Sequence, residues 1–167
     1  DTRDRQGIYV VRKVDPTWTH PIAVALTRPY TDSTLALDAR LLPGQGQQVV
    51  DMACRQSPVN VSTEYRLSVY PAGGDVVLVR WLKGARKELA HVTLHPSQLR
   101  PGDAWNRIAL SCVGARISVS VNDKKDVIAT RDSALSGGMM WFGPALNNDT
   151  GRYTVEAHVR RLEVDES

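Results

Sequence analysis

A tryptophan flanked by basic residues is the part of the sequence best suited to hold a ligand. Trp81 lies near the end of an alternating segment, between Arg80 and Lys83, and Arg55 ends an earlier segment. An indole offers a flat apolar surface and a guanidinium offers fixed donors, which is the combination that a sugar ring with hydroxyl groups requires. The alternative is a half-buried Trp81 that covers the edge of a sheet. We take Arg55, Arg80 and Trp81 as the candidate ligand-binding residues.

Motifs for catalysis are not found in the sequence. Retaining glycosidases need an acid and a nucleophile about 5 Å apart, yet no E-x-D-x-x-E string is present, and no G-x-S-x-G turn presents a nucleophile. We interpret the four histidines (His20, His91, His95 and His158) as surface or structural residues, the usual state of a histidine in a strand. Scattered residues can also assemble an active site. The sequence therefore favours a non-catalytic protein without deciding the point.

One polar loop carries oxygen ligands of the kind that Ca²⁺ accepts. Asn148 and Asp149 lie in it, between Asn147 and Thr150. A single carboxylate is few for calcium affinity, and an ordinary Asx-rich turn is the alternative. We take Asn148 and Asp149 as candidate calcium ligands and expect no other cofactor.

The elements that must position these residues are predicted to be strands. Apolar and polar residues alternate from Trp105 to Asp123, with reversals at Gly114 and at Asn122–Asp123, which predicts strands with one buried and one solvated face. Similar segments at 8–14, 21–26, 34–42, 48–55, 64–70, 75–82, 87–94, 105–112, 116–121, 126–131, 138–143 and 152–164 predict an all-β fold, a two-sheet antiparallel β-sandwich. The side chains expected between the sheets include Leu67, Val69, Ile108, Leu110, Ile117, Val119 and Val121. Trp105 and Trp141 are also expected to pack in the core, since their neighbours are apolar.

Short motifs along the chain follow one another in the order of a known family. They are Trp105-Asn106-Arg107, Cys112-Val113-Gly114, Val121-Asn122-Asp123 and residues 132–138, preceded by residues 7–11, 37–41, 54–55 and 64–69. In this order and spacing the chain resembles the exported bacterial branch of the concanavalin A-like, laminin-G-like jelly rolls, from about residue 7 to residue 164. The resemblance implies a single jelly-roll domain over residues 1–167. It also favours a strand over residues 32–44, where local propensity equally fits a capped helix.

The two cysteines have two possible states. Cys54 and Cys112 lack the neighbouring ligands of a zinc site and the spacing of a C-x-x-C motif. They are either buried thiols that pack as small apolar residues or a disulfide. In the family that the chain resembles, cysteines at these two places often occur together, which implies a disulfide between neighbouring strands and an oxidising location.

Composition limits the partners that the chain is expected to have. The net charge is +3, and the nearest approach to a basic patch is Arg80, Lys83, Arg86 and Lys87, which a solvated hairpin end explains equally well. No nucleic-acid-binding motif accompanies the patch. No apolar run approaches the roughly 20 residues that span a bilayer, so no membrane insertion is expected. The polar ends suggest a domain cut from a longer exported or membrane-anchored protein.

These features together predict a non-catalytic extracytoplasmic binding or sensor module of the extracellular space or cell envelope. A glycan or cell-wall polysaccharide is the first expected ligand. The alternatives are an adhesion or assembly domain that contacts a cell-surface protein and a glycoside hydrolase of unrecognised type. A jelly roll hosts all three activities, so the fold alone does not choose among them.

Overall fold

The computed structural model describes residues 3–5, 8–13, 24–26, 28–42, 47–59, 62–147 and 155–166. Throughout these ranges the regular structure is β-strand, and no helix there is long and apolar enough to cross a membrane. The strands are β1 (Arg3–Arg5), β2 (Ile8–Lys13), β3 (Val24–Ala25), β4 (Ser33–Leu41), β5 (Gln47–Gln56), β6 (Glu64–Tyr70), β7 (Asp75–Leu82), β8 (Ala85–Thr93), β9 (Asn106–Val113), β10 (Arg116–Val121), β11 (Lys124–Arg131), β12 (Met139–Asn147) and β13 (Val155–Glu166).

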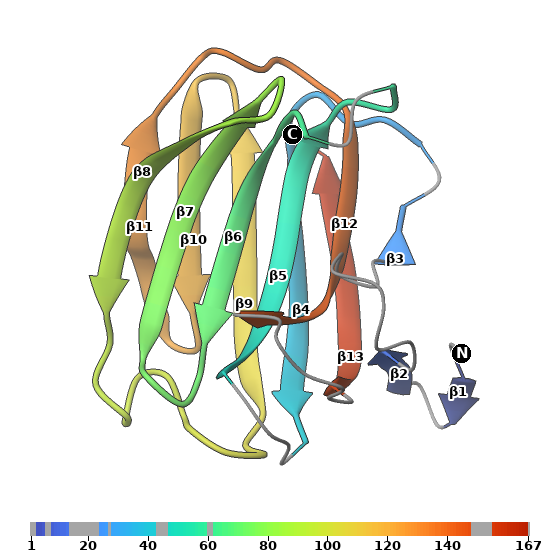
Figure 1. Ribbon diagram of the computed structural model, residues 1–167, viewed down its shortest axis with the longest axis vertical. Helices are drawn as coiled ribbons and strands as arrows, with labels where there is room; N and C mark the ends of the chain where they lie inside the picture. Colours follow the sequence, from blue (N-terminus) through green and yellow to red (C-terminus); the bar gives the residue numbers. More distant parts are fainter. Residues whose placement is uncertain are drawn as a thin grey trace.

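The strands form two antiparallel sheets that face each other (Figure 1). One sheet has seven strands in the order β1-β2-β13-β4-β9-β10-β11, and the other has six in the order β3-β12-β5-β6-β7-β8. In Figure 1 the six-stranded sheet lies in front of the seven-stranded sheet. This arrangement confirms the predicted two-sheet antiparallel β-sandwich of the jelly-roll type.

The predicted strands are found along the chain. Each of the twelve predicted segments overlaps an observed strand, and β1, whose residues are all charged, is the strand that alternation did not predict. Residues 33–41 form a strand rather than a helix because β4 pairs with β9 on one side and β13 on the other. These ladders, together with complete burial of Leu35 and Leu37, outweigh the local helix propensity.

The core lies between the two sheets and contains the residues predicted from alternation. Seven predicted core side chains are fully buried: Leu67, Val69, Ile108, Leu110, Ile117, Val119 and Val121. Burying one such side chain contributes about 1.5–3 kcal/mol. Because the inward-facing positions supply this stabilisation, the outward-facing positions of the same strands can carry polar groups.

The disulfide prediction is confirmed, but the predicted relation of its two strands is wrong. Cys54 and Cys112 are bonded, with their Cα atoms 6.7 Å apart. Cys54 belongs to β5 of the six-stranded sheet and Cys112 to β9 of the seven-stranded sheet, so the bond crosses the core instead of joining neighbours in one sheet. In the chain-entropy account, closing a loop of 58 residues restricts the unfolded state by about 4 kcal/mol.

Candidate functional site

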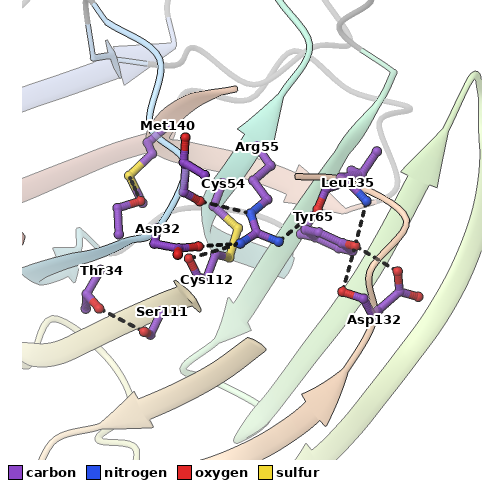
Figure 2. Close-up of a disulfide and its surroundings, with 12 residues drawn as sticks. Asp32, Thr34, Cys54, Arg55, Tyr65, Ser111, Cys112, Asp132, Leu135 and Met140 are labelled. Carbon is purple, nitrogen blue, oxygen red and sulfur yellow. Dashed lines mark hydrogen bonds and ion pairs between the residues drawn. A yellow bond between two sulfur atoms is a disulfide. The ribbon is translucent and has the colours of Figure 1, made fainter. Parts of the chain in front are cut away.

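Arg55 lies inside the sandwich, beside the disulfide (Figure 2). Its left-handed backbone, with φ of 55°, coincides with a bulge of β5 against β12 and turns the side chain inwards. The guanidinium donates hydrogen bonds to four acceptors: Asp32 Oδ1 and the carbonyl oxygens of Thr31, Cys112 and Leu135. Only 3% of Arg55 is exposed, so this side chain ties loops to the two sheets and is closed to a ligand.

Arg80 faces the core side of its sheet. It is opposite Tyr65 in the β6–β7 register, and both side chains bind Asp132 at 2.7 Å, Arg80 through Nη1 and Tyr65 through its hydroxyl. Burial and the bond to Asp132 raise the pKa of Tyr65 to about 12, so the hydroxyl stays protonated and donates. Figure 2 shows that Tyr65 and Asp132 meet close to Arg55.

Trp81 points to the opposite side of the six-stranded sheet, because successive side chains of a strand alternate. There it belongs to a group that we call the Glu64 cluster: Glu64, Arg66, Trp81 and Trp141. The Arg66 guanidinium lies 5.3 Å from the ring centre of Trp141 and 5.9 Å from that of Trp81. Glu64 is fully buried and accepts hydrogen bonds from Arg66 Nε at 2.7 Å and Trp141 Nε1 at 2.8 Å.

The predicted ligand-binding residues therefore do not share one surface. Arg55 and Arg80 face the interior, whereas Trp81 faces outwards. A ligand contact at Trp81 stays a prediction, but neither arginine is placed to assist it. Trp141, expected in the core, is buried instead beneath Arg66 on the outer face, where Glu64 satisfies its indole N–H.

The candidate calcium ligands Asn148 and Asp149 lie outside the described residues. Within the described ranges, no three His, Cys, Asp or Glu side chains gather closely enough to hold a metal ion. The calcium prediction is therefore untested.

A pocket of about 340 Å³ opens on the outer face of the seven-stranded sheet. We call it the Asp38 pocket. Three central strands and the turns beside them line it, through Asp38, Arg100, Trp105, Arg107, Asn122, Asp123, Arg160, Arg161 and Glu163. Register explains the convergence, because Asp38 of β4 is directly opposite Arg107 of β9 and Arg160 of β13.

Asp38 is the centre of this pocket. It is only 4% exposed and binds three guanidinium groups, through Arg107 Nη1 at 3.4 Å, Arg160 Nε at 3.2 Å and Arg161 Nε at 2.8 Å. A buried carboxylate requires such partners, since an unpaired buried charge is costly. Arg107 also binds Glu163 and the carbonyl oxygen of Arg161.

A bulge in β13 brings two consecutive arginines to the same carboxylate. The pairing with β4 shifts between Arg160 and Glu163, and Arg161 has a left-handed backbone with φ of 48°. In a regular strand Arg160 and Arg161 would face opposite sides of the sheet. A left-handed non-glycine residue costs roughly 1–2 kcal/mol, and here it falls on an arginine whose side chain is 66% exposed. Backbone strain of this kind occurs at functional sites and also at structural bulges such as that of Arg55.

Trp105 lines the pocket, and the expectation that it packs in the core is wrong. The guanidiniums of Arg160 and Arg40 lie 4.1 Å and 4.9 Å from its ring centre. Trp105 precedes β9, whose inward alternation begins further along the strand, so its ring lies against cations on the surface. Stacking of this kind contributes about 0.5–2 kcal/mol and holds the ring in place.

Asn122 fixes the turn beside the pocket. It adopts the left-handed backbone expected of its type, with φ of 52°. Its amide donates to Gln98 O at 2.6 Å and Asn106 Oδ1 at 2.9 Å, and its Oδ1 accepts the Arg107 N–H at 2.9 Å. The turn that borders the pocket is thus tied to β9.

Sequence patterns missed this site, although one signal was present. Apolar residues of β13 occupy odd positions up to Val159 and even positions from Leu162 onwards. Such a change of phase at Arg160–Arg161 indicates a bulge. Nothing local, however, links Arg160 with Asp38, which is 122 positions away.

No protein-family model and no curated protein sequence matches the chain. Solved structures do resemble it. The carbohydrate-binding module CBM66 from Bacillus subtilis has a TM-score of 0.70 at 15% identity, covering 98% of this chain and 84% of the module. Sheep galectin-11, in complex with glycerol, has a TM-score of 0.58 at 15% identity, covering 89% of this chain and 98% of the galectin.

A putative glycosyl hydrolase from Parabacteroides distasonis is similar to a comparable degree. Its TM-score is 0.62 at 12% identity, and the match covers 99% of this chain and 90% of that one. At such identities the likeness concerns the fold alone. The chain has a concanavalin A-like jelly-roll fold, as the sequence motifs predicted, and its place in an exported bacterial branch stays a prediction.

Proposed function

We propose that the chain is a non-catalytic glycan-binding module and that the Asp38 pocket is its binding site. The observation that carries the proposal is the meeting, in one pocket, of an indole with fixed guanidinium groups. Sugar sites need this pairing, because the C–H face of a pyranose packs on an aromatic ring while its hydroxyls require directed hydrogen bonds. The carbohydrate-binding module with the same fold supports the choice of ligand class.

The polar groups of the pocket are held in place before any ligand arrives. Arg107, Arg160 and Arg161 are fixed by Asp38, and Arg160 is also stacked on Trp105. Immobilising a flexible side chain on binding costs about 0.5–1.5 kcal/mol. A prearranged donor set avoids much of that cost, which favours recognition of a weakly bound, hydrated ligand such as a saccharide.

The pocket is poorly suited to hydrolysis. Glycoside hydrolysis needs two carboxyl groups free to act on the substrate. Of the three that line the pocket, Asp38 is engaged by three arginines and Glu163 by Arg107, which leaves Asp123 alone. Asp51, a further buried carboxylate, is 4% exposed and beyond the reach of a sugar. We therefore propose binding without turnover.

An extracytoplasmic location fits the proposal. The Cys54–Cys112 disulfide persists best in an oxidising compartment, and such compartments are where polysaccharides are met. Expression with and without export to the periplasm tests this, since the oxidised form should accumulate only on export.

Titration of the protein against a panel of soluble polysaccharides tests the proposed function. At least one member should bind, and Trp105→Ala should weaken that binding by about 10- to 100-fold, the loss typical of a central aromatic contact. Thermal unfolding of the variant shows whether it still folds. Absence of binding to every polysaccharide, together with capture of a protein partner, would contradict the proposal and favour an adhesion domain.

A further inference from the structure

We infer that the ligand of the Asp38 pocket is acidic: a saccharide carrying a carboxylate or a sulfate ester. This inference rests on the proposed function and specifies its ligand class. Its first basis is charge. Four arginines line the pocket (Arg100, Arg107, Arg160 and Arg161) against three carboxylates, and three of these arginines share the single carboxylate of Asp38.

The second basis is the set of guanidinium donors that have no acceptor among the described residues. Arg160 and Arg161 both bind Asp38 through Nε. Across the described part of the chain, no hydrogen-bond acceptor is recorded at the terminal nitrogens of either residue. A guanidinium held by its Nε presents the two terminal nitrogens as a fork, and this fork matches the paired oxygens of a carboxylate or sulfate.

A third observation concerns Arg100. Its guanidinium donates to the carbonyl oxygen of Trp105 at 3.2 Å, and no carboxylate pairs with it among the described residues. It therefore brings an uncompensated positive charge to the pocket wall. An anion bound in the pocket would pair with Arg100 and would give Arg161 a second partner beside Asp38.

The pocket fits one anionic group better than a polyanion. Asp123 and Glu163 also line it, and their carboxylates would repel a second nearby charge. Nucleic acid requires a continuous basic stripe, which these carboxylates interrupt. With an indole in the same pocket, the arrangement favours a sugar residue that bears a single charged substituent.

Matched pairs of saccharides test the inference. One pair is a disaccharide that carries a single galacturonate and its carboxyl-reduced, neutral counterpart; the other is a galactan disaccharide that carries a single sulfate ester and its desulfated form. We expect the charged member of at least one pair to bind tenfold or more tightly than its neutral counterpart. The pair that shows the difference identifies the anion as carboxylate or sulfate.

Substitution at Arg161 completes the test. Arg161→Gln should weaken binding of the charged member by a larger factor than binding of the neutral member, so that most of the charged member's advantage is lost. Arg161→Lys should keep only part of that advantage, because a lysine lacks the fork. Arg86→Gln is the matched control, since Arg86 is similarly exposed and paired but lies on the other sheet.

Two results would overturn the inference, and they differ in what they leave standing. If both members of each pair bind equally and Trp105→Ala abolishes that binding, the pocket binds neutral glycans and only the inference fails. If none of the four saccharides binds but a neutral polysaccharide of the panel does, only the inference fails; if nothing in the panel binds either, the inference fails together with the proposed glycan function. Retention of the charge preference in Arg161→Gln would also refute the role of this arginine.

Discussion

The two outer faces of the sandwich combine the same three groups in different proportions. On the six-stranded sheet, the buried carboxylate of Glu64 holds one arginine, Arg66, over tryptophan rings. On the seven-stranded sheet, the buried carboxylate of Asp38 holds three arginines, one of them over Trp105. The first cluster is balanced in charge and closed, whereas the second has surplus cations and surrounds a pocket.

This difference separates a structural cluster from a binding site. Both oxygens of Glu64 are occupied, by Arg66 on one side and by Gln56 and Trp141 on the other. Arg66, Gln56 and Trp141 all donate to this one buried carboxylate, so the group stabilises the fold. In the Asp38 pocket the terminal nitrogens of Arg160 and Arg161 have no acceptor among the described residues, and both arginines line the opening.

The largest effect on stability is expected when the Glu64 cluster is disrupted. Glu64→Ala should lower the free energy of unfolding by about 3–5 kcal/mol, because it leaves Arg66 and the indole N–H of Trp141 without their buried acceptor. Urea denaturation measures this loss. Glu88→Ala, at an exposed position of the same sheet, is the control and should change stability by less than about 0.5 kcal/mol. An equal, small effect at both positions would mean that the Glu64 cluster does not stabilise the fold.

A second test uses a buried carboxylate of the same face that has no arginine bonded to it. Burial raises the pKa of Asp51 to about 6, while Ser68 donates to it at 2.6 Å. The folded protein then retains a proton that the unfolded chain releases, so stability should fall as pH rises from about 4 to about 7, by up to about 3 kcal/mol. Denaturation across this range should show the loss in the wild type and not in Asp51→Asn. Parallel curves of unfolding free energy against pH for the two proteins would contradict the raised pKa of Asp51.

A pair of tryptophan variants compares the faces by ligand affinity. Trp105→Ala should weaken polysaccharide binding by about 1–3 kcal/mol, and Trp81→Ala should change it by less than about 0.5 kcal/mol, as is usual for positions outside a binding site. Calorimetric titration of both variants and the wild type with the same saccharide measures the two changes in binding free energy. The reverse order would move the binding site to the six-stranded face and restore the prediction made for Trp81.

The smallest effect on stability is expected at the bulge of β13. Arg161→Gly should leave the free energy of unfolding within about 0.5 kcal/mol of the wild type. Relief of the left-handed strain offsets the lost ion pair and the greater freedom of glycine in the unfolded chain. Binding of the charged saccharide should nevertheless weaken. A destabilisation above about 1 kcal/mol would mean that Arg161 is kept for folding, and the contrast between the two faces would lose its basis.

The sequence alone determined the class of fold, most strand positions and the core. Alternation is a local property, and it placed Ile108, Leu110, Ile117 and Val119 between the sheets before any strand partner was known. The motif order further indicated the jelly roll and the cysteine pair. The turn at Asn122 was equally local, since asparagine tolerates the left-handed backbone.

Tertiary structure alone decided where the arginines point and which of them meet. Arg55 and Arg161 both have left-handed backbones at bulges, yet the first is turned into the core and saturated, and the second is turned to the surface beside Asp38. Local alternation predicts neither side-chain direction, because a bulge reverses the order of inward and outward positions along the strand. Asp38, Arg107 and Arg160 come together only through the strand order β13-β4-β9. Strand order is set by the packing of the whole chain, so the change of phase in β13 can indicate a bulge but not the residues of β4 and β9 that meet it.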